Sequence, residues 1–319
     1  MSTMPSQPEA AQAPQGPWRS FVCWLDSWAE DQRTATSAPK DVDWLRVVPF
    51  IALHLSCLFA ITVGWSWTAL TVATLAYCAR MFAITAFYHR FFSHRSFKTS
   101  RAMQFGFALI GATAIQRGPI WWASHHRAHH TVSDEEADVH SPVRHGFWWS
   151  HVGWVLSRAN FRPRFELVAD LMRFPELRFL DRFDTLLPAL SFVGFYGLGV
   201  GLAEFGLQTS GWQIVIWGFS ISTIVTHHVT FSINSVAHRS GSRSYDTTDD
   251  SRNNLLLSLL TFGEGWHNNH HRYPASARQG FQWWQIDISY YVLRLMAALG
   301  LVWHLKPVPA RVIAQGRPH

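Results

Sequence analysis

The sequence predicts an all-α integral membrane protein, with four transmembrane helices in two hairpins and a cytoplasmic helical cap rich in histidine. Composition, paired apolar segments and clustered histidines support this fold class. Of 319 residues, 48% are hydrophobic and only 15% charged, against about 25% charged in an average soluble domain. The 17 tryptophans suit a protein with two membrane interfaces.

Four apolar segments lie in two pairs, one on each side of a polar middle region. The predicted spans are near 47–63, 67–87, 186–203 and 212–233. Each approaches the roughly 20 residues that cross a hydrocarbon core of about 30 Å. Short joins through Gly64 and Gly206 make each pair an antiparallel hairpin. The four ends opposite the joins therefore face the same side of the membrane.

The placement of positive charge predicts which side that is. All 27 Lys and Arg residues lie outside the two short joins. Positive residues favour the cytoplasmic side, so we expect an inner (plasma) membrane protein with both termini and the polar middle region in the cytoplasm. The formal charge of +6 comes with no basic run or nucleic-acid motif, which argues against a nucleic-acid partner and for contact with anionic membrane lipids.

The polar and apolar segments predict three regions along the chain. Residues 1–44 are expected to be a cytoplasmic N-terminal tail, residues 45–305 the membrane domain, and residues 306–319 a C-terminal tail. Met103–Ile115 is too short to span and is expected to be interfacial or re-entrant. Trp283–Trp303 contains Asp287 and Arg294, which favours an amphipathic helix lying on the membrane over a fifth span.

The 18 histidines form three clusters in the regions assigned to the cytoplasm. The clusters are His89-x4-His94, His126-x2-His129-His130 and His267-x2-His270-His271. Helical positions i, i+3 and i+4 share a face, so each His-x2-His-His should present three imidazoles together. Residues five apart are about 140° apart around a helix. The first pair can therefore converge on one metal only if the helix distorts or other ligands lie between them.

Eight clustered imidazoles exceed the coordination number of one metal ion, which predicts two metals. Imidazole also binds zinc, copper and nickel. A structural zinc site would favour cysteine, and the three cysteines form no Cys-x-x-Cys. The Glu-x-x-His motifs of carboxylate-bridged di-iron bundles are missing too. Two redox metals, with iron favoured, beside a membrane indicate oxygen chemistry on an apolar substrate.

The three histidine boxes, in this order and spacing, resemble those of the membrane fatty acyl desaturases. The four-residue gap in the first box is similar to the acyl-CoA Δ9 (stearoyl-CoA-like) branch, in its short bacterial-type form without a cytochrome b5 domain. The resemblance extends from about Val47 to Tyr291. Three further short segments also match the family: Ser150-His-Val-Gly-Trp154, Asn234-Ser-Val-Ala-His238 and Gly263-Glu-Gly-Trp-His-Asn268.

The resemblance implies a site with two Fe(2+) ions and O2 as co-substrate. The metal-binding residues that it implies are His89, His94, His126, His129, His130, His238, His267, His270 and His271, with Asn234 holding a metal-bound water. It implies a substrate tunnel lined by Gln116, Trp122 and Thr230. His125 is outside this pattern and is expected to support the site or lie on the surface. His227 and His228 are expected to be a pair at the end of a helix.

The implied reaction is O2-dependent desaturation of a long-chain fatty acyl thioester, giving a cis double bond at C9. We expect acyl-CoA as the carrier, with its phosphates near basic residues that flank the boxes: Arg90, Arg95, Lys98, Arg117, Arg127 and Arg144. Ser124-His125 stands where animal members carry Arg-Asp, so an acyl-lipid or acyl-carrier-protein substrate remains an alternative. Electrons are expected from a separate ferredoxin, rubredoxin or flavin reductase. A di-iron alkane or lipid hydroxylase and a histidine-rich metal transporter are the competing functions.

Overall fold

The structure, a computed structural model, describes residues 17–29 and 40–316. Helices dominate the described chain, and its strands β1 (Lys98–Thr99) and β2 (Val302–Trp303) form one short antiparallel pair. The prediction of an all-α fold is confirmed. Of the two predicted tails, residues 1–16, 30–39 and 317–319 lie outside the described residues.

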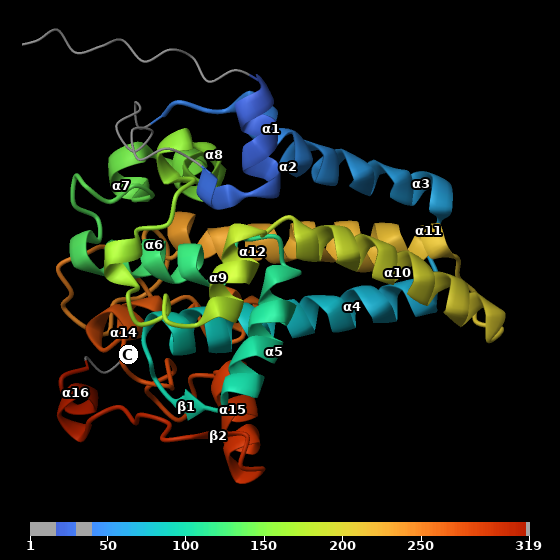
Figure 1. The fold of residues 1–319 in the computed structure, drawn as a ribbon. Coiled ribbons are helices and arrows are strands. Elements are labelled where there is room, and N and C mark those ends of the chain that lie inside the picture. The colour runs from blue at the N-terminus through green and yellow to red at the C-terminus, as the bar shows by residue number, and fades with distance from the viewer. Residues whose placement is uncertain (1–16, 30–39, 317–319) are drawn as a thin grey trace, which may run out of the picture.

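Four helical segments are long and apolar enough to cross a membrane, as predicted. They are Trp44–Val63, Trp67–Ser93, Leu186–Glu204 and Gly211–Ser235. Their parts are α2 (Trp44–Ser56), η3 (Cys57–Phe59) and α3 (Ala60–Val63); α4 (Trp67–Phe82) and η4 (Ala83–Ser93); α10 (Leu186–Glu204); and α11 (Gly211–Ile214), η8 (Val215–Ile221) and α12 (Ser222–Ser235). Figure 1 shows both hairpin joins at one end of this bundle.

The remaining elements gather mainly at the opposite end of the bundle and form a cap (Figure 1). They are α5 (Arg101–Ala112), α6 (Pro119–Val132), α7 (Pro142–His145), η5 (Trp149–Gly153), α8 (Trp154–Leu156), η6 (Arg158–Asn160), η7 (Phe165–Leu167), α9 (Pro175–Arg182), α13 (Leu255–Leu260), α14 (His267–Arg272), α15 (Ile288–Ala298) and α16 (Ala310–Ala314). The cap contains most of the clustered histidines, so the fold brings them together at one end of the spans.

The second span continues six residues beyond its predicted end at Phe87. Its last part, η4, is a π-helix that is buried almost throughout. The polar residues His89 and Arg90 suggested an end of the helix, but both are buried and paired. Arg90 is fully buried and forms ion pairs with Glu264 (3.0 Å) and Asp287 (2.9 Å). Paired charges can be buried, so polarity did not mark the end of the helix.

The two ambiguous apolar segments form shorter helices than a span requires. Met103–Ile115 corresponds to α5, which packs against η4 and runs across the direction of the spans in Figure 1. Within Trp283–Trp303, only α15 is helical, over 11 residues. At 1.5 Å per residue, such a helix is about 17 Å long, which is too short to cross the bilayer.

Part of the expected N-terminal tail belongs to the folded bundle. Residues 17–29 form α1 (Pro17–Leu25) and η1 (Ser27–Ala29), and α1 packs against α2. Polar residues separate this stretch from the first span, which is why its sequence is typical of a tail. The local amino-acid composition did not reveal the side-chain contacts that hold residues 17–29 in place.

An aromatic core joins η4 to the cap. Phe87 stacks on Phe107 of α5 with ring centroids 3.9 Å apart, and Tyr88 donates a hydrogen bond to the carbonyl of Ala108 (3.0 Å). An added Cβ at Gly111 would lie 2.2 Å from the Tyr88 ring, so α5 approaches η4 at a position that requires glycine. This close contact fixes the π-helix that carries His89.

Asp181 of α9 is a buried carboxyl that ties the cap together. It accepts hydrogen bonds from the backbone N–H of Trp121 (2.7 Å) and the indole N–H of Trp28 (2.9 Å). Burial raises the pKa of Asp181 from 3.8 to about 7. The folded chain therefore holds this proton more tightly than the unfolded chain does.

We expect the stability contributed by Asp181 to be fully present below pH 3.8 and to be lost as the pH rises through about 7. In the Asp181→Asn variant this dependence should vanish. The measurement is the thermal midpoint of each protein in detergent, from about pH 5 to about pH 8. As the pH rises, the difference between the two midpoints should shrink, and at the alkaline end the variant should melt at the same or a higher temperature. A constant difference between the two midpoints would contradict the assignment.

Candidate metal centre

The π-helix η4 supplies the distortion that the five-residue spacing of the first box required. The backbone N–H of His94 bonds to the carbonyl of His89 at 3.3 Å, an i→i−5 bond of the π type. A turn closed over five residues returns His94 to the side of the helix that carries His89. Their ring centroids lie 4.9 Å apart. π-turns inside helices are frequent at functional sites.

Five histidines from all three boxes form the first group of ring nitrogens. One nitrogen from each ring lies within 4.8 Å of all the others, in His89, His94, His126, His130 and His270. The shortest Nε2–Nε2 separations are 2.7 Å for His94–His126 and 2.8 Å for His130–His270. Bonds of about 2.0–2.1 Å to a shared metal place neighbouring ligand nitrogens at about this separation.

Four further histidines form the second group under the same 4.8 Å limit: His129, His238, His267 and His271. Nε2 of His238 lies 3.0 Å from Nε2 of His267. The nine histidines implied by the family resemblance thus occupy two groups of five and four. None of the nine is left outside.

The expectation that each His-x2-His-His box presents its three imidazoles together is wrong, because each box is divided between the two groups. On α6, His126 and His130 enter the first group, whereas His129 enters the second. On α14, His270 enters the first group, and His267 and His271 enter the second. Positions i and i+4 differ by about 40° and i+3 lies about 60° to the other side. Each helix therefore contributes to both groups.

Buried carboxylates orient four of the nine rings through Nδ1. Nδ1 of His238 donates to Asp134 (2.7 Å), Nδ1 of His129 to Asp138 (3.0 Å), and Nδ1 of His271 to Asp249 (2.5 Å). Nδ1 of His89 contacts Glu264 in the same way. These acids are Asp134, Asp138, Asp249 and Glu264, and each fixes the tautomer and direction of its ring.

The electrostatics of the site favour an ionised Asp134 and, in three rings of the first group, neutral imidazoles. Burial lowers the pKa of His126, His130 and His270 well below 6.5, and neighbouring imidazoles lower it further. Burial acts to raise the pKa of Asp134, but its hydrogen bond and charge interaction with His238, together with hydrogen bonds from Ser141 and the Asp250 backbone, lower the pKa to about 2. Neutral imidazole is the form that binds metal.

The donor set fits metal ions. An imidazole that donates Nδ1–H to a carboxylate carries a lone pair on Nε2. In the second group, His129, His238 and His271 are all of this kind, and Nε2 of His271 is buried without a hydrogen-bond partner. Converging lone pairs repel one another unless a cation lies between them. The arrangement therefore suits one metal ion in each group.

Sequence reasoning missed the four carboxylates. Asp134 lies 104 residues from His238, and Glu264 lies 175 residues from His89, so spacing along the chain gave no signal. Glu264 does lie in Gly263–Asn268, a segment beside the third box that matches the family, and this match was the available signal. His140 was missed as well, although it lies with His129 and Asp138 in a third group of possible ligand atoms.

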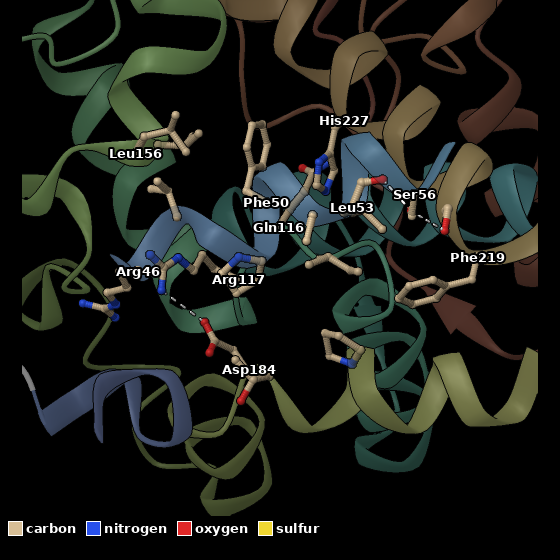
Figure 2. Close-up of a pocket in the computed structure, with 18 of the residues that line it drawn as sticks. Arg46, Phe50, Leu53, Ser56, Gln116, Arg117, Leu156, Asp184, Phe219 and His227 are labelled. Atoms are coloured by element: carbon tan, nitrogen blue, oxygen red, sulfur yellow. Dashed lines mark hydrogen bonds and ion pairs between the residues drawn. The ribbon is translucent and has the colours of Figure 1, made fainter. Parts of the chain in front are cut away.

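A cavity of about 1200 Å³ adjoins the first group and extends between the spans. His126 lines it, and so do Gln116, Trp122 and Thr230, the three residues implied as the tunnel. The Gln116 amide donates to the Thr230 hydroxyl at 3.2 Å, and Trp122 stacks on His126 with centroids 5.1 Å apart. Figure 2 shows Gln116 and His227 on this wall. Asn234 lines the cavity but belongs to neither group.

Three other histidines lie near the site without joining either group. His125 is buried, and its Nε2 donates to the carbonyl of Arg162 (3.1 Å). His227 is buried on the cavity wall and donates through Nε2 to the carbonyl of Ala114 (2.8 Å). His228 instead contacts His54 (3.2 Å) and His151 (3.0 Å). Each of the three is therefore engaged by partners other than the grouped nitrogens.

The fold and site define an integral membrane protein with two histidine groups that could hold metal ions, beside an apolar cavity. The family model for fatty acid desaturases matches residues 64–306, and the chain belongs to that family. It is 37% identical to an sn-1 stearoyl-lipid 9-desaturase of Anabaena variabilis, over 85% of this chain and 97% of that one. It is 41% identical to Delta-9 acyl-lipid desaturase 1 of Arabidopsis thaliana, over 84% of each chain, and 37% identical to Acyl-CoA 5-desaturase AL21 of Anemone leveillei, over 86% and 85%.

Removing one orienting carboxylate should weaken metal binding without unfolding the chain. Asp249→Asn should lower the affinity of the second group for Fe(II) about 10–100-fold, because His271 loses its orienting acceptor. Iron retained against a graded chelator measures this directly. Asp250→Asn is the matched control, since its side chain is 44% exposed. Equal iron retention in the two variants would contradict a role for Asp249.

Proposed function

We propose that this protein is a di-iron, O2-dependent desaturase that converts a long-chain fatty acyl group to its cis C9-unsaturated form. The observation that carries the proposal is the position of the first histidine group against the cavity wall formed by Gln116, Trp122 and Thr230. The relatives whose names specify C9 support the position of the double bond. The proposed ligands are the nine grouped histidines, and Asn234, which lines the cavity, would hold a metal-bound water.

Two iron ions bound by the two groups would supply O2 activation strong enough to remove hydrogen from unactivated C–H bonds. The contribution of the chain is positioning. Trp122 stacks on His126 at the metal side of the cavity, and Gln116 and Thr230, joined by a hydrogen bond, line the same cavity. An acyl chain held between them has a fixed carbon nearest the first group. The buried apolar lining also excludes water.

The carrier of the acyl group has two candidates. The phosphates of a CoA thioester were expected to lie near six basic residues. For Arg90 this expectation is wrong, because its side chain is fully buried and paired with Glu264. Arg95 and Arg127 share Asp170, and Arg117, which lines the cavity, pairs with Asp184 at 3.5 Å. An acyl-lipid is the second candidate, favoured by the exposed Phe59, Phe192 and Trp212 on the cavity rim.

The remaining proposals concern membrane placement and electron supply. We propose that the cap and both termini face the cytoplasm at the plasma membrane, which the distribution of Lys and Arg supports. A ferredoxin, rubredoxin or flavin reductase would supply electrons from outside the chain. The acyl substrate, the electron donor and membrane lipids are the partners.

Lipids of a desaturase-deficient host test the reaction. Expression should yield cis C9 monounsaturated chains by gas chromatography and mass spectrometry. A hydroxylated product would favour the hydroxylase alternative and contradict the proposal. Purified protein supplied with a donor system and either stearoyl-CoA or distearoyl phosphatidylcholine vesicles would then identify the carrier.

The position of the double bond should depend on the cavity wall that Gln116 and Thr230 form. The double variant Gln116→Leu, Thr230→Val removes the hydrogen bond between the two side chains, so the acyl chain should slide and produce a mixture of double-bond positions. Iron content should be unchanged. Thr74→Val, an exposed threonine on α4, is the control and should give C9 only. A pure C9 product from the double variant would rule out this role for the wall.

A further inference from the structure

The segment α1–η1 precedes the region matched by the family model and has an exposed apolar face. Trp18, Phe21 and Leu25 are exposed at 75%, 42% and 58%, whereas Ser20 and Cys23 are buried. Positions i, i+3 and i+7 share one face of a helix. The three side chains therefore form a stripe, and the rings of Trp18 and Phe21 lie 5.7 Å apart.

Side-chain hydrogen bonds fasten this segment to the starts of two spans. Ser20 Oγ donates to Asp43 (3.0 Å), the residue immediately before α2. At the other end, Ser27 Oγ donates to Asp184 (2.5 Å) and Thr185 Oγ1 donates to the carbonyl of Trp24 (2.6 Å). Residues 184 and 185 immediately precede α10. The segment thus bridges α2 and α10.

The bridge crosses the cap-side end of the cavity. Cys23, Trp24 and Leu25 line the cavity together with residues of α2–α3 and α10. Figure 1 shows α1 running across the direction of the spans, and Figure 2 shows Arg46, Arg117 and Asp184 at this end. Farther along the spans, Phe59 and Phe192 line the cavity and are also exposed. The cavity therefore opens sideways between α2–α3 and α10.

The bilayer is the partner that fits the stripe. α1 packs on α2, which begins a candidate membrane span and exposes Trp44, Val48 and Ile51. A helix that lies across the ends of spans with an aromatic and aliphatic face has the character of an interfacial helix. The interfacial lipid region would cover apolar surface that water would otherwise contact.

We propose that α1–η1 is an interfacial strap: its Trp18–Phe21–Leu25 face lies in the membrane interface, and its anchors set the opening between α2 and α10 through which an acyl chain passes from the bilayer into the cavity. The passage of the acyl chain rests on the proposed function. The contact with the bilayer does not.

Membrane contact is tested with an environment-sensitive fluorophore on single cysteines. In a C23A, C57A, C78A background, the nitrobenzoxadiazole label is placed at Phe21→Cys or, as the control, at Glu136→Cys, an exposed position in the cap. In phosphatidylcholine vesicles, the label at 21 should emit at shorter wavelength and be quenched by brominated acyl chains, and the label at 136 should not. Water-like, unquenched emission at 21 would overturn the contact.

The strap's effect on access is tested with Ser27→Ala, which removes the bond to Asp184. Loss of a hydrogen bond to a charged group should raise hydrogen exchange in α1 about tenfold. Desaturation of vesicle lipid should change at least about twofold, with bound iron unchanged. Ser240→Ala, at an exposed serine, is the control.

Two results would overturn the role in access. Unchanged exchange in α1 would mean that Ser27 is not an anchor, and increased exchange with an unchanged rate would mean that the strap does not govern the opening. A wild-type protein without desaturase activity would count against the proposed function instead, and the fluorophore result would still decide the membrane contact.

Discussion

Nine imidazoles can converge with their lone pairs facing one another only if each ring is neutral and held in one direction. Burial lowers the pKa of six of the nine rings. Carboxylates accept Nδ1–H from four of the nine. The rest of the structure follows from this requirement. The carboxylates must themselves be buried and bonded, as Asp134 is by the backbone N–H of Asp250 and by Ser141. Such a network is costly if any member is unpaired.

The membrane bundle and the metal centre share structural elements, which links the chemistry to the cavity. η4 ends the second span and carries His89, while its Arg90 binds Glu264, the acid that orients His89. α12 ends the fourth span and places Thr230 and Asn234 on the cavity. The cavity wall proposed to align an acyl chain and the histidine groups proposed to bind metal therefore share the same helices.

Local sequence patterns predicted the spans and the histidines, because both depend on residue type and short spacing. The four spans lie within a few residues of their predicted positions, apart from the extension of the second to Ser93. Periodicity could not predict the π-helix η4 or the division of His126, His129 and His130 between two groups. Both depend on packing against α5 and on the position of α14. The orienting acids were missed because they lie far from their histidines in sequence.

The N-terminal segment shows the same limit. Its residues looked like a tail because no apolar run marked them, yet Ser20, Ser27 and Trp28 bind carboxylates that lie next to or within distant helices. Contacts of this kind depend on the tertiary fold. They cannot be read from local composition.

The most direct test of the account is iron analysis combined with X-ray absorption at the iron edge on protein purified from iron-replete cells. We expect two irons per chain, each with nitrogen and oxygen ligands, the multiple scattering of imidazole, and no sulfur in the first shell. One metal per chain, or a content of mostly zinc that iron does not replace on reconstitution, would contradict the division of nine histidines into two iron sites.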